Sequence, residues 1–325
     1  MNLSRSVLSL LAVVALAATG CAGETTSDAE ASAPEGAPLV VATTTILADL
    51  VGELAGDAVT VEALMAPGQD PHGFAPSAKQ AQRLREADLV VAFGLGLEEA
   101  ADDALQAAEE DGVPVVHVAE AADPLGIGES AEEHADEDEG HAHDHEDGDP
   151  HVWFDPIRMA EGMTVVSEAL AEIAPDAADW DARAESLADE LEAVDDEVAG
   201  ILADVPDQCR LLVTNHDNLR YLAERYDLEV IGTVLPGTST SAEPSAQDFA
   251  ELADLLEETG APAVFAETTQ SSRLAESLVA EVGRDVAVVE LFTDSLGEPG
   301  SGADTYAGMM TTDARRIADA LADCA

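Results

Sequence analysis

The strongest constraint on the fold is an alternation, repeated along the chain, between short β-branched runs and segments with helical spacing of apolar residues. The runs predict strands over 39–45, 59–65, 88–93, 113–118, 210–214, 229–234, 263–266 and 286–291. The helical spacing predicts helices over 46–55, 77–87, 97–108, 157–174, 177–203, 217–226, 246–259, 271–282 and 306–323. Strands that alternate with helices form mostly parallel sheets covered by helices. We therefore expect an α/β protein.

The longest predicted helix, residues 177–203, divides this alternation into two halves. Its apolar residues recur at alternating steps of four and three. A coiled coil has the same spacing, but the opposite face is acidic with almost no bases to pair, which disfavours a homodimer. We expect a monomer with two α/β lobes, residues 39–175 and 205–325, joined by a linking helix within 176–204.

The first 21 residues are typical of a secretory signal peptide, with one basic residue, an apolar run and small residues before Cys21. Cys21 resembles the acylated cysteine of a bacterial lipobox, although Ala18 stands where that pattern prefers Leu. The apolar run is too short to span a membrane comfortably. The small, polar and acidic residues 22–38 then predict a flexible tether. We expect an exported lipoprotein, held at the outer face of the cytoplasmic membrane only by its lipid.

The other two cysteines are Cys209 and Cys324. Two cysteines remaining in an exported chain suggest a disulfide between them. This bond would tie the last helix to the start of the second lobe.

Acidic residues greatly outnumber basic ones, with 68 Asp and Glu against 13 Lys and Arg and a formal net charge of −55. This charge excludes nucleic acid as a partner, because two polyanions repel each other. It favours a cationic ligand. The same bias is also typical of proteins from high-GC or salt-exposed organisms, so the charge alone does not identify a ligand.

Residues 129–148 consist almost entirely of Asp, Glu, His, Gly and Ala. A segment without apolar side chains cannot bury enough surface to become ordered, so we expect a mobile loop. Its histidines are His134, His141, His143 and His145. Histidines between carboxylates predict a weak collector of metal ions, with a solvated acidic insertion as the alternative.

Three further histidines lie in segments framed by Pro or Asp, namely PGQDPHGFAP, DPHVWFDP and TNHD. They are His72, His151 and His216. His72, His216 and Asp294 are predicted at the carboxyl ends of strands, where α/β proteins gather their ligands, and His151 is predicted in a rigid loop. Three imidazoles and one carboxylate suit a tetrahedral Zn²⁺ site.

Nearby carboxylates are candidates for supporting this site. Glu267 follows another strand and is either an alternative ligand or, as we prefer, a hydrogen-bond partner of a ligand. Imidazole ligands usually donate their second N–H to an acceptor, and Asp70, Asp149 and Asp217 are further candidates for that role. Ordinary turn and capping chemistry would also explain these aspartates.

With these motifs the chain resembles the metal-binding solute receptors of ABC transporters, the ZnuA/TroA-like family, over about residues 39–322. The most specific pieces are GQDPHGFAPS, GDPHVWFDP, TNHDNLRYLAERYDLEVIGT, FAETT and LFTDSLGEPGSGADTYAGMM. The resemblance implies two α/β lobes joined by a long rigid helix, with one metal ion in the cleft between them. It assigns the ligand roles to His72, His151, His216 and Asp294.

The resemblance also bears on the metal and the partners. In the manganese branch of the family the position of His216 usually holds Glu, so histidine there favours Zn²⁺, with Mn²⁺ as the alternative. The C-terminal motif occurs in members of both kinds. The implied partners are a membrane permease with its ATPase, and a metallochaperone is a further candidate.

The main rival function is a secreted zinc hydrolase with Asp294 or Glu267 as general base. The sequence contains no HExxH pair and no recognisable setting for a Ser or Cys nucleophile. We therefore expect a protein that binds a metal without catalysis. Binding should weaken as the pH falls, because each imidazole must lose a proton to become a ligand. A long helix between the lobes predicts only a small closure.

Overall fold

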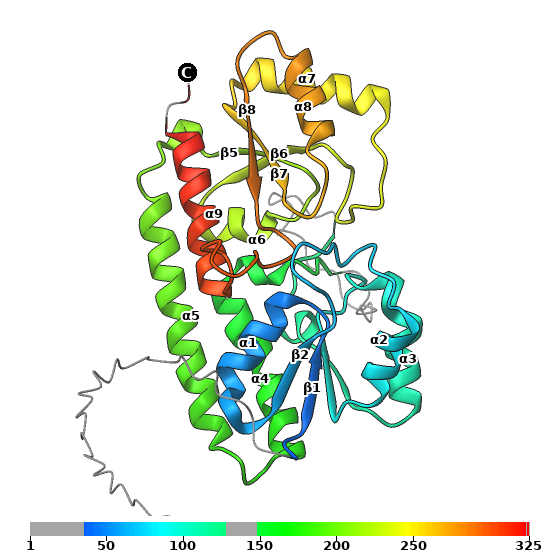
Figure 1. Ribbon diagram of the computed structural model, residues 1–325. Helices are drawn as coiled ribbons and strands as arrows, with labels where there is room; N and C mark the ends of the chain where they lie inside the picture. The colour runs from blue at the N-terminus through cyan, green and yellow to red at the C-terminus, as the bar shows by residue number, and fades with distance from the viewer. Residues whose placement is uncertain (1–35, 128–147, 323, 325) are drawn as a thin grey trace, which may run out of the picture. The chain divides into compact units, whose positions relative to one another are not determined.

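The computed structural model describes residues 36–127, 148–322 and 324 of the chain. Within them it contains two parallel four-stranded sheets, each flanked by helices (Figure 1). The predicted signal peptide with Cys21, nearly all of the tether, and the four histidines of the acidic segment lie outside the described residues. The predicted α/β class with two lobes is confirmed.

The first lobe is built on a sheet with the strand order β2-β1-β3-β4. Its strands are β1 (Leu39–Ala42), β2 (Thr60–Ala63), β3 (Leu89–Ala92) and β4 (Val115–His117). Its helices are α1 (Thr45–Ala55), α2 (Ala78–Arg85) and α3 (Asp102–Glu110). All three strand pairs are parallel, so every strand ends at the same edge of the sheet.

The second lobe repeats this arrangement with the strand order β6-β5-β7-β8, again all parallel. Its strands are β5 (Leu211–Thr214), β6 (Glu229–Thr233), β7 (Ala263–Glu267) and β8 (Ala287–Leu291). Its helices are α6 (Arg220–Tyr226), α7 (Ala246–Thr259) and α8 (Arg273–Glu281). The two lobes therefore share one topology without a close sequence repeat.

Three long helices connect the lobes: α4 (Pro156–Ile173), α5 (Trp180–Leu202) and α9 (Tyr306–Leu321). The predicted linking helix, α5, packs against α4 and α1 of the first lobe and along α9, which follows the last strand of the second (Figure 1). Its apolar stripe, including Leu187, Leu191 and Val198, is buried in this layer. The predicted linking helix is thus part of a layer of packed helices between the lobes.

Side-chain alternation along the strands explains how the hydrophobic cores are divided. In β1, Val40 faces the cluster shared by α1, α4, α5 and α9, and Val41 faces a second cluster beneath α2 and α3. In the second sheet, Phe265 belongs to the shared cluster, and Val264 belongs to a third cluster beneath α7 and α8. One core therefore continues from the first lobe to the second.

Local hydrogen bonds account for two differences from the predicted boundaries. The β-branched run predicted as strand 39–45 ends at Ala42, because Thr44 caps α1 by accepting a hydrogen bond from Leu47 N. The helix predicted from residue 217 begins at Arg220, because Asn218 N bonds the carbonyl of His216 in a tight turn.

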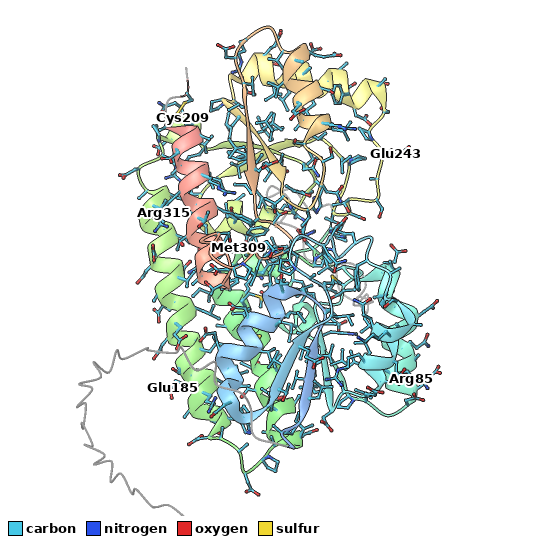
Figure 2. All side chains as sticks on the ribbon, in the orientation of Figure 1. Arg85, Glu185, Cys209, Glu243, Met309 and Arg315 are labelled. Atoms are coloured by element: carbon cyan, nitrogen blue, oxygen red, sulfur yellow. A yellow bond between two sulfur atoms is a disulfide. The ribbon has the colours of Figure 1, made fainter. Side chains whose placement is uncertain are left out.

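Cys209 and Cys324 form a disulfide with a Cα–Cα distance of 5.5 Å, as expected, beyond the end of α9 (Figure 2). It closes a loop of 115 residues that contains nearly the whole second lobe. Among the described helices, none is both long and apolar enough to cross a membrane.

Candidate metal centre

Four predicted ligands come together where the carboxyl ends of the two sheets meet. His72 lies in the loop after β2, and His151 directly precedes a 3-10 turn, Val152–Phe154, that leads into α4. His216 follows β5 and Asp294 follows β8. Each lobe thus contributes two side chains.

One potential ligand atom from each of the four residues lies within 4.8 Å of the other three. The Nε2 atom of His151 is 3.3 Å from that of His72 and 3.2 Å from that of His216. All four side chains are buried, and His151 and His216 are fully so. Four buried polar groups of this kind, drawn from distant segments, indicate a site built for a cation.

Two carboxylates orient two of the histidine rings through contacts with their Nδ1 atoms. Asp149 Oδ1 lies 2.7 Å from His151 Nδ1 and also accepts the backbone N–H of His151 at 3.1 Å. Glu267 Oε1 lies against Nδ1 of His216 and accepts a 3.1 Å hydrogen bond from Asn218 Nδ2. In both rings the Nδ1 proton is therefore fixed, and Nε2 faces the other predicted ligands.

Asp294 has one oxygen that is held and one that is not. Its Oδ2 accepts hydrogen bonds from the hydroxyls of Thr293 at 3.1 Å and Thr269 at 3.4 Å. Its Oδ1 is buried without a hydrogen-bond partner among the described residues. A buried carboxylate oxygen left unpaired is costly unless a ligand completes it, so this atom fits a metal-binding role.

The surroundings of His72 and His216 shift their pKa values in opposite directions. Burial, together with the charges of His151 and His216, lowers the pKa of His72 to about 2, so this ring is neutral and ready to coordinate. Burial also acts to lower the pKa of His216, but Glu267 and the more distant acids outweigh it and raise the pKa to about 9. Burial and the charge of Glu267 raise the pKa of Asp294 to about 6.

The remaining two candidates for supporting the site, Asp217 and Asp70, have different contacts. Asp217 lies 4.0 Å from Arg220 Nε and has no hydrogen bond to a ring nitrogen in the described part of the chain. Asp70 supports His72 through its backbone, accepting that N–H at 3.0 Å. The other oxygen of Asp70 accepts hydrogen bonds from Thr240 and Gln270 of the second lobe, both at 2.6 Å. Sequence reasoning proposed Asp70 for the site but not this bridge between the lobes.

Further bonds between the lobes surround Asp294. Trp153 donates its indole N–H to the carbonyl of Thr293 at 2.7 Å. Ser295 Oγ accepts the backbone N–H of Gly68 at 2.8 Å, and the backbone N–H of Leu296 reaches Thr45 Oγ1 at 2.9 Å. The segments next to the ligands are therefore attached to the opposite lobe.

At pH 9, where proton competition at His216 is small, we expect Glu267→Gln to weaken metal binding by about 10- to 100-fold, the usual effect of removing an acceptor behind a ligand histidine. The amide keeps the shape of the side chain but removes the charge that stabilises the Nδ1 proton of His216. Competitive titration with a chelator measures the change. Glu120→Gln, which alters a carboxylate 3.2 Å from the partly exposed His117, is the matched control. Unchanged affinity in Glu267→Gln would remove Glu267 from the site.

Comparison with known proteins identifies the family of this chain. Residues 40–320 match the family described as zinc-uptake complex component A, periplasmic. The zinc-binding protein TroA of Treponema pallidum is 33% identical over 296 residues, covering 90% of this chain and 91% of that protein. The manganese-binding lipoprotein MntA of Halalkalibacterium halodurans is 29% identical over 304 residues, covering 93% of each. The solved structure of T. pallidum TroA superimposes with a TM-score of 0.77 over 89% of this chain and 100% of that one.

The fold and the matching relatives define the class of this protein as a metal solute-binding protein of an ABC transporter. Proteins of this class bind and release their solute and are not enzymes. Within that class, the chain belongs to the ZnuA/TroA-like family.

Proposed function

We propose that the protein captures Zn²⁺ outside the cytoplasmic membrane and delivers it to a membrane permease for import. His72, His151, His216 and Asp294 bind the ion, and each contributes one atom. The observation that carries this proposal is the convergence of four buried ligand atoms within 4.8 Å. Zn²⁺ bonds of about 2.0–2.2 Å in a tetrahedron separate neighbouring ligand atoms by roughly 3.3 Å. The Nε2 separations of 3.3 and 3.2 Å fit that spacing.

The ligand types favour zinc over manganese. Imidazole nitrogen suits Zn²⁺, whereas Mn²⁺ prefers carboxylate, carbonyl and water oxygens. Four protein ligands also close the coordination sphere, as in zinc sites that do not catalyse reactions. Manganese is the second candidate, because relatives of similar identity are named for either metal.

The proposed location is the outer face of the cytoplasmic membrane, with Cys21 acylated after signal cleavage. A lipid on Cys21 would anchor the protein within reach of its permease and ATPase. The relative from H. halodurans is named a lipoprotein, which supports this assignment.

Metal analysis followed by competition between Zn²⁺ and Mn²⁺ tests the proposal on protein that begins at residue 22. We expect one tightly held Zn²⁺ per chain that excess Mn²⁺ does not displace, because three of the four ligands are imidazoles. Replacement of Zn²⁺ by equimolar Mn²⁺ would favour manganese import. The absence of any tight divalent ion would overturn the proposal.

A further inference from the structure

The chain has three tyrosines, all in the second half of the sequence and all buried: Tyr221, Tyr226 and Tyr306. Each hydroxyl donates a hydrogen bond to a residue outside the tyrosine's own helix. Tyr221 donates to the carbonyl of Asp149 at 2.6 Å, and Tyr306 donates to the carbonyl of Trp153 at 2.7 Å. The two acceptors lie two residues on either side of His151.

We propose that Tyr221 and Tyr306 are positioning residues, which hold His151 in place for metal binding from the opposite lobe. This inference rests on the proposed function, since it concerns how firmly the same ion is kept. It adds that metal retention depends on contact between α6 and α9 and the segment that contains His151.

Tyr221 holds this segment at two points. Its hydroxyl accepts the backbone N–H of Leu125 at 2.9 Å while it donates to Asp149. Leu125 and Asp149 are themselves joined, because Asp149 N donates to the Leu125 carbonyl at 2.7 Å. The hydroxyl therefore fixes the backbone of Asp149, whose carboxylate orients the ring of His151.

Tyr306 acts on the other side of His151. It is the first residue of α9, and its backbone N–H donates to Asp49 Oδ2 of α1 at 2.7 Å, which fixes the start of that helix. Its hydroxyl fixes the carbonyl of Trp153, whose indole packs edge-on to the His151 ring at a centroid distance of 5.1 Å. Trp153 in turn bonds Thr293, the neighbour of the ligand Asp294.

The connection also runs along the chain. Tyr221 lies only five residues after the ligand His216, so one short segment supplies a ligand from the second lobe and a support for a ligand of the first. A small local displacement of one lobe from the other would break the Tyr221–Asp149 and Tyr306–Trp153 bonds together and free His151. Release of the ion would then follow from loss of this contact, and no chemical change in a ligand would be needed.

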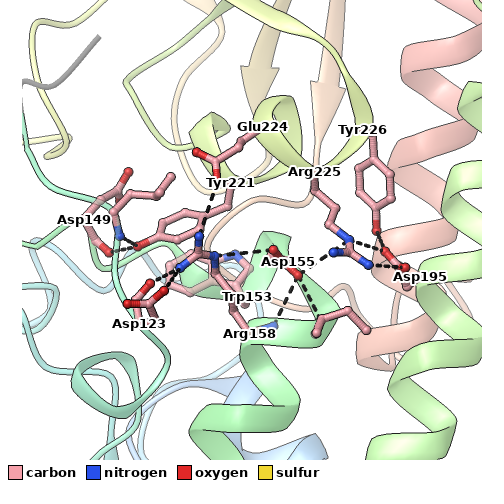
Figure 3. A network of polar contacts seen from close by, with 12 residues as sticks. Asp123, Asp149, Trp153, Asp155, Arg158, Asp195, Tyr221, Glu224, Arg225 and Tyr226 are labelled. Carbon is pink, nitrogen blue, oxygen red and sulfur yellow. Dashed lines mark hydrogen bonds and ion pairs between the residues drawn. The ribbon is translucent and has the colours of Figure 1, made fainter. Parts of the chain in front are cut away.

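Tyr226 provides a matched control on the same helix as Tyr221. Its hydroxyl donates to Asp195 Oδ1 of α5 at 2.9 Å, and Asp195 also receives two hydrogen bonds from Arg225. Figure 3 shows Tyr221 directed to Asp149 and Tyr226 directed to Asp195. Both Tyr→Phe changes remove one buried hydroxyl, but only Tyr221→Phe removes a direct hydrogen bond to a residue next to His151.

The test compares Tyr221→Phe, Tyr306→Phe, their double variant and Tyr226→Phe in the purified protein. The first measurement is the rate of Zn²⁺ loss to excess chelator. We expect each of the first two variants to lose Zn²⁺ about three- to tenfold faster, the scale of one hydrogen bond, and the double variant faster still. Tyr226→Phe should stay within about twofold of the wild type, although its unfolding temperature falls to a similar extent.

The second measurement needs no metal. Hydrogen exchange of the amides in 149–155 should accelerate in metal-free Tyr221→Phe and Tyr306→Phe but not in Tyr226→Phe. If both variants match Tyr226→Phe in zinc loss and in exchange, the tyrosines have only a structural role and the inference is wrong. If the wild type itself holds neither Zn²⁺ nor Mn²⁺, the proposed function fails and this inference fails with it.

Discussion

His216→Ala should abolish tight zinc binding. The variant removes one of the three imidazoles and leaves the buried carboxylate of Glu267 without its main partner. Loss of the acceptor behind a ligand histidine typically costs about 10- to 100-fold in metal affinity, so loss of the histidine itself should cost more than about 100-fold. Chelator competition followed by metal analysis measures this loss.

His117→Ala is the control for this variant. His117 is partly exposed at the end of β4 and pairs with Glu120 rather than with the four converging residues. It should keep the affinity of the wild type. His216→Gln is a second variant for the case in which the alanine variant does not fold, because glutamine fills more of the space left by the imidazole. Tight binding by a folded His216→Gln protein would show that His216 is not a ligand.

Zinc affinity should fall steeply as the pH is lowered from 9. In the metal-free protein the pKa of His216 is raised to about 9 by Glu267 and the other acids, against the opposing effect of burial. Below this pH the ring carries a second proton, and the 3.2 Å contact between its Nε2 and that of His151 places that proton where the metal would bind. Each bound ion must displace it, so we expect about a tenfold loss of affinity per pH unit below 9.

The direction of this pH dependence follows from the pKa of His216 in the metal-free protein. A raised pKa strengthens proton competition at neutral pH, whereas an unshifted histidine would begin to compete only near its ordinary value of about 6.5. Below about pH 6 the slope should steepen, because Asp294, with its pKa raised to about 6, also takes up a proton. Affinity measured from pH 5 to 9 provides the test, and Glu267→Gln should flatten the curve between pH 7 and 9. A flat curve in the wild type over that range would contradict the assigned proton.

The sequence predicted the lobes well because the relevant signals are local. Val40 and Val41 belong to one short β-branched run, and the stripe that includes Leu187 and Leu191 has helical spacing, so each pattern specifies its own element. The three histidines predicted as ligands differ from the other five in being framed by Pro or Asp in segments at strand ends. The expected clustering of His216 and Asp294 followed from the rule that strand ends share one edge of a sheet.

The contacts between the lobes could not be predicted in this way. Asp70 meets Gln270 across 200 positions, and Tyr306 meets Trp153 across 153. No local pattern specifies such pairs, because they depend on how two separately formed lobes are oriented. Within the first lobe, the buried Glu98 accepts a hydrogen bond from the Thr43 hydroxyl, 55 positions away at the end of a neighbouring strand, and this contact also has no local sequence pattern.

The hydrophobic core that α4, α5 and α9 share with both sheets has a consequence for transport. Bending one lobe away from the other would expose part of that apolar interior to water, so large rearrangements are costly. We therefore expect the metal-free and the metal-bound receptor to have nearly the same overall shape. A transporter that engages only the metal-bound receptor could not distinguish it by overall shape. It would have to recognise small differences in local order near the ion, such as the rigidity of the loops around His72 and Asp294.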